Sequence, residues 1–322
     1  MNKPGKIAPP GKSASKRGSL LERAGSAFGF NLGPAKMPAQ LPDAKKRMPT
    51  LKPPVESAPA LRDVEPVPGG REEVTGPAVQ FGPKKHPVSR QLLRENGLID
   101  PDAATSALFE EFRIVKRQVL ATAKSEGTAL SRRVLVTSPH MGEGKTFCSI
   151  NLALALAAEQ DIEVVLVDAD FAKPSVTKRL GLDAGPGLMD ALAGSDTPVE
   201  NHVLRTDIAN LLVLPAGRQA QRDAELLASD RTWELLGRLT RGAPDRVLVF
   251  DSPPALAASP AAELAKHVGQ TLLVARADST PRVALEDALD LLSGCGDIRL
   301  LLNDVTFSPS GRSFGRYYGL GD

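Results

Sequence analysis

The chain has 322 residues, of which 42% are hydrophobic but only 4% aromatic, so its core must be built from aliphatic side chains. The two cysteines, Cys148 and Cys295, show no pairing or metal-ligand spacing, which excludes a disulfide scaffold and a cysteine metal site. No apolar run reaches the ~18 residues of a membrane-spanning helix, and the first residues lack a signal-peptide core. We therefore expect a soluble protein of the reducing cytoplasm.

The first 90 residues differ from the rest in charge and proline content. They hold 16 Lys/Arg against 7 Asp/Glu and 15 of the 27 prolines, whereas the remainder holds 24 against 31. Such a segment cannot bury enough apolar surface to offset its chain entropy. We predict a basic disordered tail over residues 1–91, with one short helix near 19–30. It is expected to be a solvated linker, although its charge also suits contact with an anionic membrane or an acidic partner; no nucleic-acid partner is expected.

Beyond the tail, helical and strand-like stretches alternate. Residues 107–124 place apolar side chains at helical spacing. Short aliphatic runs predict strands at 132–137, 163–170, 211–217, 246–254, 270–278 and 298–304. Because helical stretches separate most of these runs, we predict a doubly wound α/β domain with a mostly parallel sheet over residues 92–306. A flexible C-terminal segment, 307–322, would follow.

A glycine-rich loop follows the first predicted strand. The stretch from Pro139 to Thr146, PHMGEGKT, nearly matches the phosphate-binding pattern G-x-x-x-x-G-K-[ST], with proline at its first position. Glycines let backbone N–H groups turn inward around a phosphate, and the next helix directs its positive end at it. This predicts a P-loop NTPase fold with ATP and Mg²⁺ as cofactors, and the fold resembles the MinD/ParA-like type. The residues predicted to hold the nucleotide phosphates are Gly142, Glu143, Gly144, Lys145, Thr146 and Phe147.

Acidic residues end two other predicted strands. Asp168 and Asp170 end the second strand, and Asp251 ends the fourth. In such sheets ligands bind beyond the carboxyl ends of the strands, so these carboxylates are expected beside the P-loop. A solvated acidic pair would also explain Asp168 and Asp170 taken alone. Together with the P-loop they predict a Mg²⁺ shell formed by Thr146, Asp168, Asp170 and Asp251.

Three stretches together, VLVTSPHMGEGKT, VVLVDADFAKPSV and VLVFDSPP, resemble the nucleotide motifs of the bacterial tyrosine kinases of polysaccharide export. The resemblance covers about residues 107–322, and GLMDALAG, LLVLPAG and AELLAS are similar to the cytoplasmic autokinases of exosortase-associated loci. It implies an ATP-dependent protein-tyrosine autokinase that phosphorylates its own C-terminal tyrosines in trans and regulates exopolysaccharide synthesis and export. It also implies a cytoplasmic location at the inner face of the cell membrane, reached through a partner.

The resemblance implies a role for each matching residue. Lys145 would bind ATP phosphates, and Asp168 would accept the tyrosine proton or act as a metal-linked acid. Asp170 and Asp251 would complete the metal shell, which makes the catalytic set Lys145, Asp168, Asp170 and Asp251. Asn303, after the last strand, would read the adenine edge, although an ordinary turn asparagine explains that position equally well. Where the family usually has arginine, this chain has Ala172 followed by Lys173, so phosphate contact is either weaker or made imperfectly by the lysine.

The resemblance further implies partners. Glu110, Arg113 and Lys116 occupy the positions of a family motif, E-x-x-R-x-x-R, used in subunit contacts, with lysine for the last arginine. A solvated helix face would give the same spacing. The implied partners are further copies of the chain, in a ring-type or other homo-oligomer, and a membrane-anchored co-polymerase that activates it.

Tyr317 and Tyr318 are the only two tyrosines of the chain and lie side by side near its end. Nearby glycines would let them reach a neighbouring subunit, so we predict them as the phosphoacceptors. A frayed terminus that happens to hold two tyrosines is the alternative. Many relatives carry a longer tyrosine cluster.

Two other functions fit the same P-loop. One is an ATPase switch of the MinD/ParA type without kinase activity; those proteins usually have a second lysine where this chain has His140. The other is a nucleotide-bound assembly subunit with little or no catalysis. Iron–sulfur carriers are disfavoured, because no Cys-x-x-Cys occurs.

Overall fold

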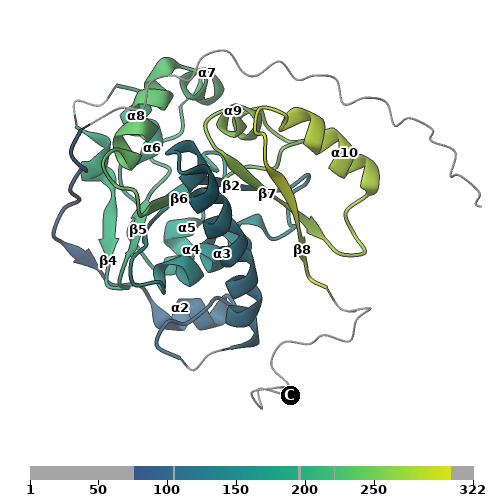
Figure 1. Cartoon of the computed structure of the whole chain (residues 1–322), viewed down its shortest axis with the longest axis horizontal. Coiled ribbons are helices and arrows are strands. Elements are labelled where there is room, and N and C mark those ends of the chain that lie inside the picture. Colours follow the sequence, from purple (N-terminus) through teal and green to yellow (C-terminus); the bar gives the residue numbers. More distant parts are fainter. Residues whose placement is uncertain (1–75, 104–105, 195–196, 221, 306–322) are drawn as a thin grey trace, which may run out of the picture. The chain divides into compact units, whose positions relative to one another are not determined.

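The computed structural model describes residues 76–103, 106–194, 197–220 and 222–305. Within these ranges the aliphatic runs form an eight-stranded sheet of order β1-β4-β5-β3-β6-β2-β7-β8 (Figure 1). Its strands are β1 (Lys85–His86), β2 (Arg133–Thr137), β3 (Glu163–Asp168), β4 (Leu204–Thr206), β5 (Leu211–Leu214), β6 (Arg246–Asp251), β7 (Gln270–Arg276) and β8 (Ile298–Asn303). Every neighbouring pair is parallel except β4 and β5.

Helices cover both faces of the sheet. They are α2 (Arg90–Glu95), α3 (Ala107–Glu126), α4 (Lys145–Ala157), α5 (Val176–Leu180), α6 (Leu188–Leu192), α7 (Asp223–Leu227), α8 (Asp230–Thr240), α9 (Pro260–Ala265) and α10 (Arg282–Leu291), with short 3-10 turns at Leu130–Arg132 and Val199–His202. Helices α3 and α4 share one apolar cluster with the sheet and lie in front of it in Figure 1. Helices α6, α8 and α9 contribute to the cluster on the opposite face.

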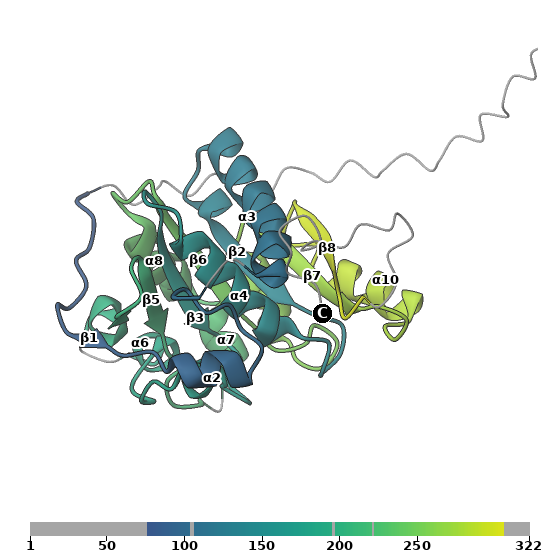
Figure 2. The same cartoon turned by 90° about the horizontal axis from the view of Figure 1, so that it is seen from below.

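This arrangement confirms the predicted doubly wound, mostly parallel sheet. Strands β2, β5 and β6 are buried at every residue, as a parallel sheet covered on both faces requires. The six strands expected from the sequence are present, and the structure adds β1 and β4 at one edge. Strand β8 and helix α10 lie at the other end of the sheet (Figure 2).

The boundary of the predicted tail differs from the structure. Residues 76–91 were expected to be disordered, but Val79, Phe81 and Val88 are buried in the apolar clusters. The guanidinium of Arg246 donates a hydrogen bond to the Val79 carbonyl at 3.2 Å and lies 4.4 Å from the Phe81 ring centroid. The domain therefore includes residues 76–91. The helix predicted at 19–30 lies outside the described residues.

The parallel register sets the functional residues at one end of the sheet. Asp168, the last residue of β3, is paired in register with Asp251, the last residue of β6. Asp251 also lies beside Val136 near the end of β2, the strand that leads into the P-loop. The sequence positions predicted to act together thus meet at the carboxyl ends of three adjacent strands.

Candidate nucleotide-binding and catalytic site

The P-loop, residues 139–146, connects β2 to α4 as predicted. Gly142 and Gly144 have φ angles of 84° and 98°, a left-handed conformation that favours glycine. Helix α4 begins at Lys145, so the N–H groups of its first residues have no partner within the helix. These N–H groups and the positive end of the helix form a cradle for an anion.

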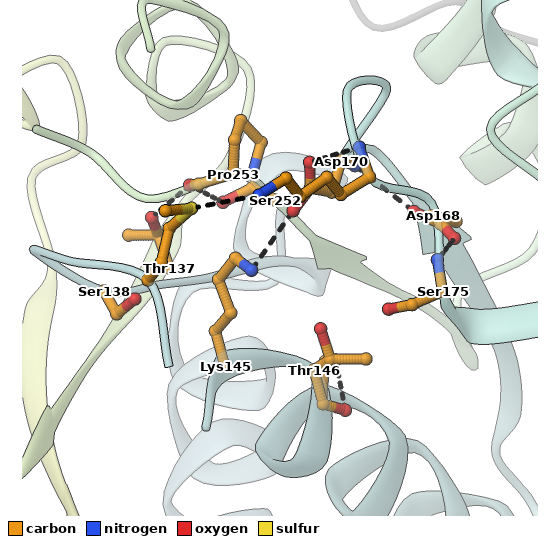
Figure 3. A network of polar contacts seen from close by, with 12 residues as sticks. Thr137, Ser138, Lys145, Thr146, Asp168, Asp170, Ser175, Ser252 and Pro253 are labelled. Carbon is orange, nitrogen blue, oxygen red and sulfur yellow. Dashed lines mark hydrogen bonds and ion pairs between the residues drawn. The ribbon is translucent and has the colours of Figure 1, made fainter. Parts of the chain in front are cut away.

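Lys145 already has a partner at this end of the sheet. Its ammonium lies 3.1 Å from the carboxylate of Asp170, which follows β3 (Figure 3). Both side chains are largely buried, with 14% and 7% of their surfaces exposed. The sequence placed Asp170 in the metal shell, whereas in this structure its carboxylate neutralises the P-loop lysine.

Asp168 holds the loop that follows β3. One carboxylate oxygen accepts hydrogen bonds from the N–H groups of Ser175 and Val176, at 2.9 and 3.0 Å, and the other accepts from Asp170 N–H at 3.2 Å. Burial raises the pKa of Asp168 to about 6, and these three backbone bonds oppose the shift. The side chain that the sequence predicted as proton acceptor or metal ligand therefore organises its own loop here.

Asp251 is a buried acid of the described part of the chain whose carboxylate has no full hydrogen-bonding partner. Among the described residues, no donor makes a full hydrogen bond to either of its carboxylate oxygens. Burial and then the nearby Asp168 charge raise its pKa to about 7, while Lys145 and the adjacent Thr146 hydroxyl lower it. A buried carboxylate left unpaired beside a phosphate cradle is what a cation-binding site requires.

The residues present fit a magnesium ion that is coordinated partly by the protein and partly by the phosphates of a nucleotide. The described residues contain no group of three or more His, Cys, Asp or Glu side chains arranged to hold a metal alone. Mg²⁺ commonly takes one or two protein oxygens and completes its shell with water and phosphate. Asp251 and the Thr146 hydroxyl supply such oxygens, whereas Asp168 and Asp170 are committed to other contacts.

Residues 129–268, which span β2 to α9, match the model of a P-loop NTPase family described as ParA, NUBPL iron-transfer P-loop NTPase. The chain is 30% identical to the VpsO kinase domain, with a TM-score of 0.50 over 62% of this chain and 99% of that one. This chain belongs to the bacterial tyrosine kinase family.

Two curated family members extend the comparison. The tyrosine-protein kinase ptk of Acinetobacter johnsonii is 30% identical over 57% of this chain and 25% of its own length. The tyrosine-protein kinase YwqD of Bacillus subtilis is 28% identical over 66% of this chain and 85% of its own length. The chain thus spans about a quarter of the first relative and most of the second.

The family's phosphate loop is braced here by a residue whose side chain the sequence left without a role. The buried carboxylate of Glu143 accepts hydrogen bonds from His140 N–H at 2.7 Å and from the Thr280 hydroxyl at 2.5 Å. Asn303 donates from its side-chain amide to the Glu143 carbonyl at 2.9 Å. Asn303 therefore lies against the P-loop. Its predicted contact with the adenine edge stays a prediction.

Other predicted positions are placed as follows. The Phe147 ring packs on Phe112 of α3, 6.3 Å between centroids, so only its backbone is left to face a phosphate. The ammonium of Lys173, beside the family departure at Ala172, lies 3.5 Å from the Met141 sulfur at the tip of the P-loop. Lysine thus reaches the loop from the β3 side even though arginine is absent.

The predicted subunit-contact residues divide into two groups. Glu110 and Arg113 form an ion pair at 3.2 Å on α3, with the Arg113 side chain 41% exposed. Lys116 is buried, pairs with Glu159 at 2.5 Å and lies 5.6 Å from the Phe109 ring centroid. The Lys116 charge is thus used within the chain, and its contact with another subunit stays a prediction. Tyr317 and Tyr318 lie outside the described residues.

Proposed function

We propose that this chain is an ATP- and Mg²⁺-dependent protein-tyrosine kinase that phosphorylates Tyr317 and Tyr318 of a neighbouring copy. Family membership supports the reaction class. The observation that carries the proposal is the buried, unpaired carboxylate of Asp251 beside the Thr146 hydroxyl and the P-loop. Regulation of exopolysaccharide synthesis is part of the proposal, and rests on the resemblance to the exosortase-associated autokinases.

Each residue has a defined task in the proposed reaction. The α4 N-terminus and Lys145 hold the nucleotide phosphates, with Lys145 exchanging Asp170 for a phosphate oxygen. Asp251 and Thr146 would hold Mg²⁺, which when bound withdraws charge from the transferred phosphoryl group. Asp168 keeps the loop after β3 in place through Ser175 and Val176. The protein thus contributes mainly positioning and electrostatic stabilisation.

We propose Asp168 as the group that accepts the tyrosine proton. Its pKa of about 6 lies close to neutrality, which suits a group that takes up and releases a proton. Asp168 is fully buried in this structure, so a tyrosine reaches it only after the loop of Ser175 and Val176 moves. Opening of that loop is therefore part of the proposed cycle.

Mixing two inactive variants tests the proposal. Lys145→Met would keep the tyrosines but lose transfer, and Tyr317→Phe/Tyr318→Phe would keep transfer but lose the acceptors. We expect labelled ATP with Mg²⁺ to label the Lys145→Met chain only when the second variant is present, as measured by mass spectrometry of its C-terminal peptide. Label on the doubly substituted chain at wild-type level would contradict tail phosphorylation.

The second candidate function is an ATPase switch of the MinD/ParA type. The match of residues 129–268 to a ParA-type family favours it. His140, where those proteins usually carry a second lysine, is exposed and takes part in the P-loop through its backbone. ATP turnover without phosphate on the tail would select this function over the kinase, and binding without turnover would select an assembly subunit.

Partners are part of the proposal as well. We propose further copies of the chain as substrate and a membrane-anchored co-polymerase as activator, with the basic N-terminal segment available to an acidic surface. No helix in the described ranges is both long and apolar enough to cross a bilayer. Assays with and without a bacterial membrane fraction that contains a polysaccharide co-polymerase would show whether activation needs such a partner.

A further inference from the structure

Glu143 places a negative charge inside a loop that is built to bind anions. The loop's free N–H groups and Lys145 attract negative charge, and the Glu143 carboxylate belongs to the same five-residue stretch. A glutamate free to rotate here would compete with phosphate for these groups. In the structure it does not, because its two oxygens are held by His140 N–H and the Thr280 hydroxyl.

Thr280 is well placed to restrain this carboxylate. It lies between β7 and α10, outside the P-loop, and its hydroxyl accepts a hydrogen bond from Arg276 N–H at 2.8 Å. That bond orients the hydroxyl, which then donates its own proton to Glu143 at 2.5 Å. A hydrogen bond to a charged acceptor is about twice as strong as a neutral one. The restraint on Glu143 thus comes from the neighbouring strand connection and from the loop's own backbone.

We propose that Thr280 is a positioning residue for phosphate binding, which acts by keeping the Glu143 carboxylate out of the P-loop cradle. The inference rests on the proposed nucleotide binding and goes beyond it, because it gives a role to a residue outside the P-loop and strand-end motifs. Thr280 itself need not touch the nucleotide. Its effect falls on the phosphates and is independent of the base.

The test compares Thr280→Val, which keeps the shape but removes the hydroxyl, with Thr280→Ser, which keeps it. Isothermal titration with Mg-ATP and with magnesium tripolyphosphate would measure affinity for phosphates with and without a base. We expect Thr280→Val to bind both ligands roughly tenfold more weakly, about the effect of one lost hydrogen bond to a charged group. Thr280→Ser is expected to bind both as the wild type does.

A second substitution identifies the cause. Glu143→Gln removes the charge, so Thr280→Val/Glu143→Gln should bind tripolyphosphate as well as Glu143→Gln alone. Thr232→Val is the matched control, because it deletes a buried threonine hydroxyl on α8 that bonds to Leu226 O, away from the P-loop. Thermal unfolding of each ligand-free variant checks the fold, and Thr280→Ala replaces Thr280→Val if the latter unfolds.

The outcomes separate this inference from the function on which it rests. Wild-type affinity in Thr280→Val would overturn the inference, as would a loss confined to Mg-ATP or an additive loss in the double variant. Failure of the wild-type chain to bind either ligand would instead overturn the proposed nucleotide binding.

Discussion

Where the parallel strands begin, two buried cations are paired with carboxylates, whereas where the strands end the described residues leave the buried carboxylate of Asp251 unpaired. At the beginning, Arg246 pairs with Glu163 and Lys116 pairs with Glu159, both at 2.5 Å. At the other end, beside the P-loop, Asp251 is fully buried with no hydrogen bond from the described residues. The first end uses charge to hold the fold together, and the second keeps a carboxylate available for a ligand.

A cavity and the P-loop site lie at opposite ends of helix α4. A cavity of about 580 Å³ lies near its last turn, bordered by residues that precede β3 and β5. The 13 residues of α4 put the P-loop about 20 Å away. The acids that line the cavity, Asp100, Asp102, Glu159 and Asp207, are each paired with Arg or Lys. Among the described residues, this cavity therefore offers no unpaired acid, whereas the unpaired buried carboxylate of Asp251 lies beside the P-loop.

The largest expected effect distinguishes the half-buried Lys145 of the P-loop from the buried Lys116 of α3. Lys145→Met should lower tail phosphorylation roughly a thousandfold, because it removes the cation at the phosphate cradle. Lys116→Met should leave phosphorylation within about twofold, because the Lys116 charge serves an ion pair at the opposite end. Rates of phosphotyrosine formation and sedimentation of each variant would be measured. Dissociation of oligomers by Lys116→Met would instead restore the subunit-contact role.

The next effect concerns the paired end, where residues 76–91 join the domain. Phe81→Ala should lower the free energy of unfolding by about 3 kcal/mol, because the ring is buried and lies against the Arg246 guanidinium. Val283→Ala on α10, whose side chain is 65% exposed, is the control and should change it by less than about 0.5 kcal/mol. Urea denaturation measures both. Equally small decreases in the free energy of unfolding for Phe81→Ala and Val283→Ala would show that residues 76–91 belong to the predicted tail.

Substituting one acid at each end should change stability in opposite directions. In EDTA at pH 8, Asp251→Asn should raise the free energy of unfolding by about 2 kcal/mol, because it removes a buried unpaired charge. Since burial raises the pKa of Asp251 to about 7, the advantage should grow as pH rises from 4 to 7 and vanish below pH 4. Glu159→Gln should lower stability, because it leaves Lys116 buried without its partner. Stabilisation of both variants would contradict the comparison.

The smallest expected effect is on the melting temperature, and it tests whether Asn303 lies against Gly144 of the P-loop. Gly142→Ala and Gly144→Ala both strain a left-handed residue, at about 1 kcal/mol each. Only at Gly144 would the new Cβ meet the Asn303 amide, at 2.0 Å, whereas nothing lies within 4 Å at Gly142. Gly144→Ala should therefore lower the melting temperature further, and Asn303→Ala should remove the excess. Equal decreases in melting temperature for the two variants would show that the Asn303 amide does not contact residue 144.

The sequence predicted the end of the sheet where the strands finish better than the end where they begin. Aliphatic runs predicted the six longer strands, because this signal is local in the chain. The P-loop motif and the strand-end acids Asp168 and Asp251 predicted residues that the structure brings to one end of the sheet. The comparison with solved structures confirms the family that those motifs suggested, and the reaction class stays part of the proposed function. The separate roles of Asp168, Asp170 and Asp251 could not be predicted from the sequence. They depend on which backbone N–H groups Asp168 contacts after the loop to Ser175 has folded.

What the sequence could not predict depends on contacts between distant residues. The segment 76–91 has the same proline-rich composition as the tail, and its order comes from Arg246, more than 150 residues later. Thr280 gives no motif signal, since its partner Glu143 lies 137 residues earlier. Lys116 matches a subunit-contact spacing, yet its burial against Glu159 is visible only after α3 packs on α4. Local pattern predicts elements and motifs, and tertiary packing assigns the partners.

The ion pair between Lys145 and Asp170 couples the binding of an anion at Lys145 to the binding of a cation near Asp170. An anion that takes the Lys145 ammonium must release the Asp170 carboxylate, which lies 3.1 Å away. The release leaves an uncompensated negative charge next to the buried Asp251 and thereby favours a divalent cation at the same edge. By thermodynamic linkage, a cation bound there strengthens the anion's affinity by the same factor. Under the proposed function, polyphosphate and metal should therefore bind this protein cooperatively.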